Sequence, residues 1–320
     1  MAKTAVAKPE KEKKRVPLNK MDKWHYTLHQ MNINKACYIM ILPFFALFTI
    51  FTIIPVVMSL PIGLTSFNLV QMPRFIGFDN FYSLFVNDDI FLKAIRNTLI
   101  LAVFTGPFSY VLSFILAWLI NEMNPFLKVF FTFVFYAPSM TPSAFVIWQL
   151  VFSGDSYGYL NSVLMDFGIL NNAVQWLTDT KYMMTVVVIV QLWSSMGAGF
   201  LSLRAGFQNI DATLYEAGAI EGIQNRFQEL FTITIPAMGN SLLFAAVLAI
   251  SGAFTVGGVG SALCGMPSTD YAVHTIMNHA QDYGSIRYEM GYASAICMVL
   301  FIVMLIFNKI VRKALSKFTD

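Results

Sequence analysis

The sequence predicts an all-α integral membrane protein, on the basis of its apolar composition, the spacing of its charges and the asymmetry of its basic residues. Hydrophobic residues make up 57% of the 320 residues and charged residues only 12%, whereas soluble domains are about 25% charged. So few charges cannot cover a globular surface with solvated side chains. The net charge of +3 argues against nucleic-acid binding. The cysteines lie too far apart in sequence to form a metal-ligand pair or a disulfide framework: Cys37, Cys264 and Cys297.

Charged residues leave six long gaps along the chain, and each gap holds the roughly 20 apolar residues that one bilayer-spanning helix needs. The gaps predict spans near residues 38–60, 97–120, 129–152, 182–203, 237–257 and 290–309. The gap between Glu229 and Asp270 is long enough for two helices. Its second part, from Gly257 to Pro267, is rich in glycine, so we expect a loop there, re-entrant only where protein or water surrounds it.

Lys and Arg are distributed unevenly between the predicted loops. Residues 1–35 carry nine Lys/Arg against three acids, and the C-terminal end adds four more basic residues. The positive-inside rule therefore predicts that both termini are cytoplasmic, which agrees with six spans. In that topology 16 Lys/Arg lie on the cytoplasmic side and 5 outside. We expect a multi-pass protein of the bacterial cytoplasmic membrane.

Three regions follow from this topology. Residues 1–35 form a basic cytoplasmic tail, residues 36–315 the membrane domain, and residues 316–320 the cytoplasmic C-terminus. The tail is predicted to be a solvated topology signal, with a lipid or partner contact as the alternative. The charged region before the first span is too long for a cleavable signal peptide, so that span is expected to be an uncleaved anchor.

A long cytoplasmic loop at residues 204–236 separates the fourth and fifth spans. Asp211 is a candidate N-cap for a first helix, which Gly222 interrupts. A second short helix is predicted from Asn225 to Thr232, and Pro236 suits the first turn of the next span. Two short helices with a glycine corner would form a platform for another protein, the alternative being an amphipathic connector on the bilayer surface.

The loop resembles the EAA loop of ATP-binding-cassette (ABC) importer permeases. The resemblance rests on Glu216-Ala217-Gly218, on Gly222, and on Ile233-Thr234-Ile235-Pro236. Further runs are similar to the carbohydrate-uptake, maltose-type branch of this family and extend the resemblance over roughly residues 35–315: Phe75-Ile76-Gly77-Phe78-Asp79-Asn80-Phe81, Arg96-Asn97-Thr98, Gly158-Tyr159-Leu160-Asn161 and Gly291-Tyr292-Ala293-Ser294-Ala295.

The resemblance implies a type I importer fold and a set of partners. These are a second homologous permease subunit, two ATPase subunits that grip the loop, an extracytoplasmic solute-binding protein, membrane lipid and a carbohydrate solute. Two features depart from the motif: Gly218 replaces its second Ala, and the stretch from Gly222 to Pro236 is one residue longer than usual. Glu216 is expected to face a cationic group of the ATPase. Gly222 is expected to be needed for backbone shape and close approach, so that a bulky side chain clashes.

No phosphate-binding G-x-x-x-x-G-K-[ST] loop is present in the sequence. We therefore expect no enzymatic activity and no bound cofactor in this chain, with ATP and Mg²⁺ on the partner ATPase. An ion-coupled secondary transporter is the rival, but it usually needs ionisable groups in the membrane, and the interiors of the predicted spans contain none. A membrane-embedded enzyme would need paired acids, a His or a metal cluster there, and these are likewise absent from the spans.

A path for a neutral polyhydroxylated solute needs hydrogen-bonding groups and aromatic faces without strong charges. Candidates on the third span are Tyr136, Ser139, Thr141, Ser143, Trp148 and Gln149, and on the fourth Gln191, Trp193, Ser194 and Ser195. Helix packing is the alternative role for each of them. A glycerol-phosphate ester is the alternative solute, but it would require cationic groups in the path.

Gln191 and Trp193 also resemble a polar–x–Trp feature of the maltose-type sugar site. Two helical positions apart, they point about 200° from each other, so a regular helix presents only one of them to a narrow cavity, and we expect that one to be Trp193. Irregularity of the helix near Gly197 and Gly199 would allow both to face the cavity. The fifth span lacks the asparagines of the maltose permease, so its sugar specificity does not carry over.

Two histidine pairs are candidate metal sites in the sequence. His274 and His279 are predicted to be surface polar residues, because a spacing of five does not place them on one helix face. His25 and His29 lack further ligands nearby in the sequence. No metal site is predicted.

Overall fold

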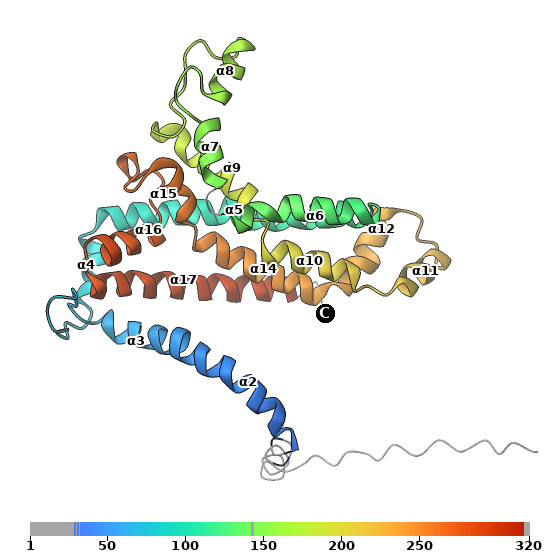
Figure 1. Ribbon diagram of the computed structural model, residues 1–320, viewed down its shortest axis with the longest axis horizontal. Coiled ribbons are helices and arrows are strands. Elements are labelled where there is room, and N and C mark those ends of the chain that lie inside the picture. The colour runs from blue at the N-terminus through green and yellow to red at the C-terminus, as the bar shows by residue number, and fades with distance from the viewer. Residues whose placement is uncertain (1–28, 30, 32, 142–143, 317–320) are drawn as a thin grey trace, which may run out of the picture. The chain divides into compact units, whose positions relative to one another are not determined.

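The prediction of an all-α protein is confirmed by a computed structural model (Figure 1). The structure describes residues 29, 31, 33–141 and 144–316, and within that part of the chain no β-strand is present. Most of the predicted tail 1–35 lies outside the described residues, as do His25, Ser143 and residues 317–320. The chain divides into two units, residues 1–58 and 59–320, which are described separately.

The described part of the first unit is one apolar helical segment. Helix α2 (Lys35–Phe48) continues through a π-helical turn, η1 (Thr49–Ile53), into α3 (Ile54–Ile62), whose last residues belong to the second unit. The segment Lys35–Ile62 has 28 residues, which is long enough to span a bilayer. It contains the predicted span 38–60.

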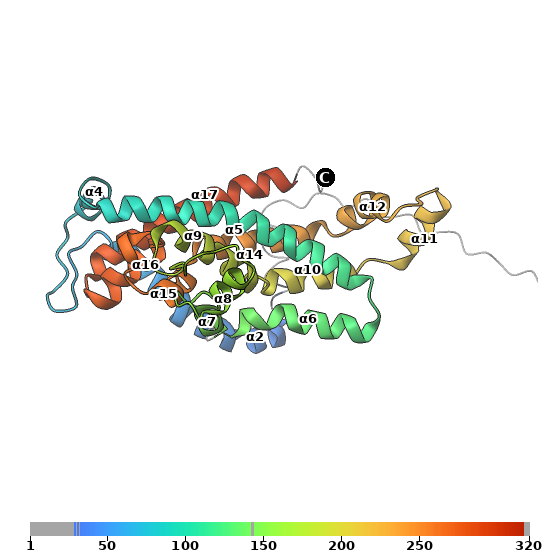
Figure 2. The same ribbon diagram turned by 90° about the horizontal axis from the view of Figure 1, so that it is seen from above.

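Four helices form the centre of the second unit: α5 (Asp89–Asn121), α10 (Ala198–Gln208), α14 (Gly239–Phe254) and α17 (Met290–Ser316). Helix α14 packs against the other three, and α10 also packs against α5, as Figures 1 and 2 show. Close approach depends on small residues: a Cβ added at Gly206 of α10 would lie 2.8 Å from Ser241 and Met238 at the other side of the contact.

Two of the predicted spans are continuous helices in this unit, α5 and α17. The others are helix pairs: α6 (Pro125–Met140) with α7 (Phe145–Val151), α9 (Thr180–Ser194) with α10, and the segment Arg226–Ala237 with α14. The bend is 41° in the second pair and 82° in the third. Together with the first segment, the described part of the chain has three helices that are long and apolar enough to cross a membrane, or up to six if each bent pair is one span. The irregularity expected near Gly197 is confirmed by the break between α9 and α10.

Short helices connect the long ones: α4 (Asp79–Val86), α8 (Tyr159–Asp166), α15 (Gly258–Cys264), η4 (Thr269–Tyr271), α16 (Ile276–Gln281) and η5 (Asp282–Ile286). The loop prediction for residues 257–267 is wrong over α15. Helix formation there follows from tertiary packing: Val259 and Leu263 are buried against the apolar cluster that holds Val187 and Val190 of α9.

The runs that resemble maltose-type permeases contain asparagines that hold loops together. Asn80 donates to the carbonyl oxygens of Gly63 and Thr65, and Asn97 donates to those of Tyr271 and His274. The fully buried Asn161 donates to three loop carbonyls and accepts from the Trp176 indole at 2.8 Å. These side chains replace backbone partners that irregular segments lack.

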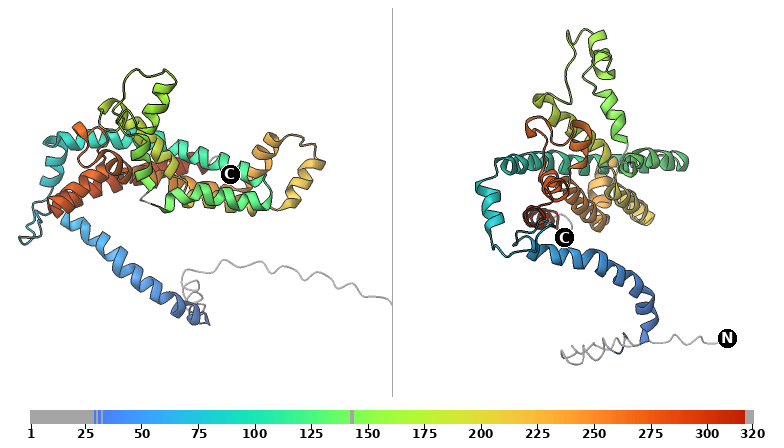
Figure 3. Two further views of the ribbon diagram at one scale, coloured as in Figure 1. Left: turned by 45° about the horizontal axis from the view of Figure 1, so that its top comes forward. Right: turned by 60° about the vertical axis from the view of Figure 1, so that its left-hand side comes forward.

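The two-helix segment predicted at residues 204–236 begins later in the structure, because residues 204–208 still belong to α10. It contains α11 (Ala212–Ile220), α12 (Arg226–Glu229), the π-helical η3 (Leu230–Thr234) and α13 (Ile235–Ala237). Figure 3 shows α11 and α12, coloured yellow to orange, projecting beyond the ends of α10 and α14. We call residues 204–236 the coupling loop.

Candidate functional site

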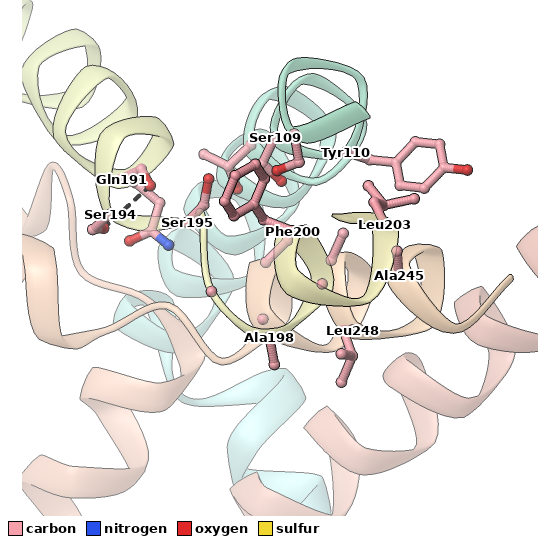
Figure 4. Close-up of a pocket in the computed structure, with 17 residues that line it drawn as sticks. Ser109, Tyr110, Gln191, Ser194, Ser195, Ala198, Phe200, Leu203, Ala245 and Leu248 are labelled. Atoms are coloured by element: carbon pink, nitrogen blue, oxygen red, sulfur yellow. Dashed lines mark hydrogen bonds between the residues drawn. The ribbon is translucent and has the colours of Figure 1, made fainter. Parts of the chain in front are cut away.

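A cavity of about 310 Å³ lies between α5, α9, α10 and α14 (Figure 4). We call it the central pocket. Helix α5 contributes three hydroxyl residues at spacings of four, Thr105, Ser109 and Ser113. The last turn of α9 contributes an amide and two hydroxyls: Gln191, Ser194 and Ser195. Apolar residues of α10 and α14 complete the wall, with Phe200 at its centre.

The polar groups of the central pocket are only partly satisfied within the chain. The hydroxyls of Thr105 and Ser195 each donate to a carbonyl of their own helix at 2.7 Å, which leaves their oxygens free to accept. Among the described residues the Gln191 side-chain amide makes no hydrogen bond. It can both donate to and accept from a solute.

The central pocket carries no charge. None of its 17 lining residues, all described, is Asp, Glu, Lys, Arg or His. A second cavity of about 300 Å³ shares Gln191, Ser194 and Gly252 with it and is also lined by Ser139. Gln191 and Ser194 therefore stand where two uncharged cavities meet.

The structure separates the residues predicted for the solute path into two groups. Gln191, Ser194, Ser195 and Ser139 line the cavities. The ring of Trp193 instead packs edge-on against Trp148, with centroids 5.4 Å apart. Gln191 lines both cavities, whereas the Trp193 indole lies in an aromatic contact between α7 and α9. Which of the two residues contacts the solute stays a prediction.

The remaining candidates on the third span make local contacts. Gln149 donates to the carbonyl of Ala262 in α15, and the carbonyl of Tyr136 accepts from the Ser139 hydroxyl at 2.8 Å. The Thr141 hydroxyl lies 3.4 Å from the Ala137 carbonyl. Sequence reasoning missed the α5 face. Its signal is Thr105, Ser109 and Ser113 at i, i+4 and i+8 in an otherwise apolar helix.

The first helix of the coupling loop begins and ends as predicted. The Asp211 carboxylate accepts from the Thr213 amide at 3.0 Å and caps α11. At the other end Ile223 N–H donates to the Gly218 carbonyl and Gly222 N–H to the Ala219 carbonyl, which is the Schellman pattern. Gly222 has φ of +95°, a conformation that glycine favours.

The residues of the EAA-like motif divide between an exposed and a buried side of α11. Glu216 and Ala217 are exposed, whereas Gly218 is buried. A Cβ at Gly218 would lie 2.5 Å from Cδ1 of Ile233 in η3. The replacement of Ala by Gly thus accompanies the close approach of Ile233.

A Cβ at Gly222 meets nothing within 4 Å, so within the described chain the requirement for glycine comes from the backbone conformation. The expected close approach to the ATPase stays a prediction. The second helix is capped by Asn225 as expected but becomes π-helical at Leu230. Pro236 lies in the first turn of α13, immediately before the bend into α14.

The prediction that His274 and His279 are surface residues is wrong, because they are 3% and 1% exposed. His274 Nε2 lies 3.2 Å from His279 Nδ1, and His279 Nε2 donates to Asp88 at 2.9 Å. Asp88 also caps α5 and accepts from the Tyr292 hydroxyl. His274 lies just before Thr275, the N-cap of α16, and His279 lies within that helix, so spacing along a single helix does not apply to the pair.

Burial sets the protonation of this pair, which lies outside the predicted spans. It lowers the pKa of His274 to about 4 and also lowers the pKa of His279, against the opposing effect of Asp88. Burial alone would raise the pKa of Asp88, but hydrogen bonds from Phe91, Tyr292 and His279 bring it below its usual value. Both histidines are therefore neutral at pH 7.

Known proteins are similar to this chain in sequence and in fold. Residues 109–318 match the family model "Binding-protein-dependent transport system inner membrane component". The diacetylchitobiose uptake system permease protein NgcF of Streptomyces coelicolor is 29% identical over 83% of this chain and 78% of its own length. The lactose transport system permease protein LacF of Rhizobium radiobacter is 30% identical over 67% of this chain and 71% of its own.

A solved structure shows the same fold. One chain of a bacterial alginate ABC transporter, in complex with an alginate pentasaccharide-bound periplasmic protein, superposes with a TM-score of 0.74 at 22% identity, covering 91% of this chain and 98% of that chain. The type I importer fold and the resemblance to carbohydrate-uptake permeases are thereby confirmed. The chain is a multi-pass permease of the cytoplasmic membrane and belongs to the family of binding-protein-dependent transport system inner membrane components.

Proposed function

We propose that this chain is the permease subunit of an ATP-driven importer that moves a neutral sugar or oligosaccharide through the central pocket. The observation that carries the proposal is the lining of that pocket: seven hydroxyl and amide side chains, the seventh being Tyr110 of α5, and no charged side chain. A sugar offers hydroxyl groups that donate and accept, which Gln191 and the α5 hydroxyls can match. A pocket lining without charges binds a neutral solute weakly enough for the solute to be released.

The proposal includes the arrangement of the complex. Both termini and the coupling loop lie on the cytoplasmic side, where two ATPase subunits carry ATP and Mg²⁺. A second, homologous permease completes the path, and an extracytoplasmic binding protein delivers the solute. Glu216, Ala217, Gly218, Gly222 and Pro236 form the ATPase contact or its framework. The exposure of Glu216 and Ala217 supports this assignment.

An anionic solute such as a glycerol-phosphate ester is disfavoured by the same observation. Stripping an anion of water requires compensating charge or strong donors, and the 17 residues around the central pocket supply no cation. Ion-coupled transport is disfavoured as well, because the central pocket holds no ionisable acid or histidine.

The test uses the complete complex reconstituted in proteoliposomes, with its binding protein and ATP. ATP-dependent accumulation is measured for a set of radiolabelled neutral disaccharides and trisaccharides and for glycerol 3-phosphate. We expect accumulation of at least one neutral saccharide and none of the ester. Accumulation of the ester alone would overturn the solute class, and accumulation without ATP hydrolysis would overturn the energy source.

A matched pair of variants tests the coupling role. Glu216→Lys is expected to abolish solute-stimulated ATP hydrolysis, because it replaces a proposed charge-assisted contact by repulsion. Gln228→Lys introduces the same side chain on the second helix of the loop, outside the EAA-like motif, and is expected to retain stimulation. Normal stimulation in Glu216→Lys would remove the assignment of α11 as the ATPase contact.

A further inference from the structure

The C-terminal end of α5, residues 117–122, contacts the coupling loop at its first residue and in its second helix. We call these residues the α5 terminus. Arg204, where the loop begins, and Arg226 and Phe227, in its second helix, all reach it. Figures 1 and 2 show α10 and α12 near the turn that joins α5 to α6. Two segments that flank α11 are thus attached to one turn of a third helix.

Arg204 is a buried cation held by the α5 terminus. It is 4% exposed, and its Nη1 lies 3.4 Å from the Ala117 carbonyl and 3.5 Å from Asn121 Oδ1. These are long hydrogen bonds, and among the described residues its Nε has no partner. The partial negative charge of a helix C-terminus attracts the guanidinium.

Arg204 is a poor choice for packing alone. A buried cation with incomplete hydrogen bonding costs more than an apolar side chain of similar volume. Its position therefore points to a task that an apolar residue would not perform, namely to keep α10 and the α5 terminus in one register.

The second attachment comes from the other side of α11. Arg226 forms ion pairs with Glu122 at 3.2 Å and with Glu229 at 3.3 Å. The ring of Phe227 packs edge-on against Trp118, with centroids 5.6 Å apart. The ion pairs are largely exposed and weak individually, but the aromatic contact beside them fixes the same geometry.

Helix α5 continues without a break from this attachment to the central pocket. Ser113 lies one turn before Ala117, and Ser109 and Thr105 follow at further turns in the direction of the N-terminus. A continuous helix that is held by the coupling loop at one end and lines the pocket along its middle can carry displacement between them.

We infer that the α5 terminus passes movement of the coupling loop to the central pocket, with Arg204 and the Arg226–Glu122 pair as positioning residues. This inference rests on the proposed transport function. Movement of α11 by an ATPase would displace α5 through both attachments, in addition to pulling on α10 and α14 through the chain itself. The pocket wall formed by Thr105, Ser109 and Ser113 would then shift relative to Gln191 on α9.

Charge exchange tests the pair in the complete complex, by measuring solute uptake per ATP hydrolysed in proteoliposomes. Glu122→Arg and Arg226→Glu are each expected to lower this ratio at least fivefold, because the reversed charges repel their partner. The double variant restores an opposite-charge pair with position 122 but not the pair with Glu229, so it is expected to recover part of the ratio and to exceed both single variants. Lys128→Glu, a charge reversal nearby on α6, serves as the control and is expected to leave the ratio unchanged.

Arg204→Met separates positioning from stability. We expect the melting temperature of the purified complex to stay the same or rise, while uptake per ATP falls at least fivefold; Arg204→Lys should recover part of the ratio. The inference is overturned if uptake per ATP is unchanged in both single charge reversals, or if the double variant is no better than the single ones. It is also overturned if Arg204→Met lowers uptake per ATP only in proportion to a fall in melting temperature. Failure of the wild-type complex to couple uptake to ATP would instead refute the proposed function.

Discussion

Replacement of Gly222 separates two explanations for the glycine at the corner of the coupling loop. The structure assigns its role to backbone conformation, since φ is +95° and a Cβ would meet nothing within 4 Å. An L-residue in the left-handed region costs about 1–2 kcal/mol, whatever the size of its side chain. Gly222→Ala and Gly222→Leu should therefore destabilise the end of α11 by nearly the same amount. Gly222→Asn should cost less, because Asn tolerates this region.

The cost should appear locally. The Schellman bonds from Ile223 to Gly218 and from Gly222 to Ala219 hold the last turn of α11. Losing about 1–2 kcal/mol there would raise amide hydrogen exchange about five- to thirtyfold in the peptide that contains α11. Exchange is measured by mass spectrometry on the purified permease pair without its ATPases, so that no partner contact contributes.

Gly218→Ala is the matched control on the same helix. Its Cβ would crowd the flexible ends of Ile233 and Ile223, which can turn away, and Ala favours a helix over Gly by about 1 kcal/mol. Exchange in α11 should change little. If Gly222→Ala behaves like the wild type while Gly222→Leu exchanges rapidly, side-chain size rather than backbone conformation is the constraint, and the reasoning fails.

Three further results are expected. Gln191→Ala should lower uptake about five- to a hundredfold, the equivalent of about 1–3 kcal/mol, while the complex still assembles. Trp193→Ala should also lower the melting temperature, because it removes the Trp148 contact. Equal melting temperatures of these two variants would contradict this division. The free energy of unfolding should fall by up to about 3 kcal/mol as the pH falls from 6.5 to about 4, because His274 is protonated in the unfolded state in this range but stays neutral in the folded state. In His274→Gln the melting temperature should lose most of this dependence on pH. A cysteine introduced by Gln224→Cys should resist impermeant thiol reagents in sealed cells, and labelling there would reverse the proposed orientation.

Charge spacing predicted most of the fold because the bilayer excludes ionised side chains. The gaps between charged residues located α5, α9, α14 and α17, since few other constraints act on a membrane helix. The starts of two short helices could also be predicted from the sequence: α11 begins after Asp211, and the second helix begins after Asn225. An Asp or Asn before a helix accepts hydrogen bonds from the free amides of its first turn.

Features that depend on tertiary contact were not predicted. The glycine-rich segment after residue 257 forms α15 because its valine and leucine pack on α9, which local sequence does not reveal. His274 and His279 are buried because the chain folds back over the start of α5. The chemistry of an indole favours Trp193 over Gln191 as the residue that faces the solute. The direction of a side chain near the break between α9 and α10 depends, however, on neighbours such as Trp148.

Part of the candidate site could be predicted from the sequence. The motif residues of the coupling loop and the polar residues of α9 were recognised, but the hydroxyl face of α5 was not. Thr105, Ser109 and Ser113 each lie in an apolar helix where small residues also serve helix packing. Only the structure distinguishes the two roles, by placing all three at the central pocket.

Solute protection of a cysteine at position 191 tests most directly whether the central pocket is the transport path. Gln191→Cys is made with Cys37, Cys264 and Cys297 replaced by Ser, and the complete complex is treated with a small cationic methanethiosulfonate reagent. We expect modification to block uptake, and the transported saccharide to slow modification at least fivefold; Trp193→Cys should not be protected. Modification at the same rate with and without solute, and with uptake retained, would contradict the account.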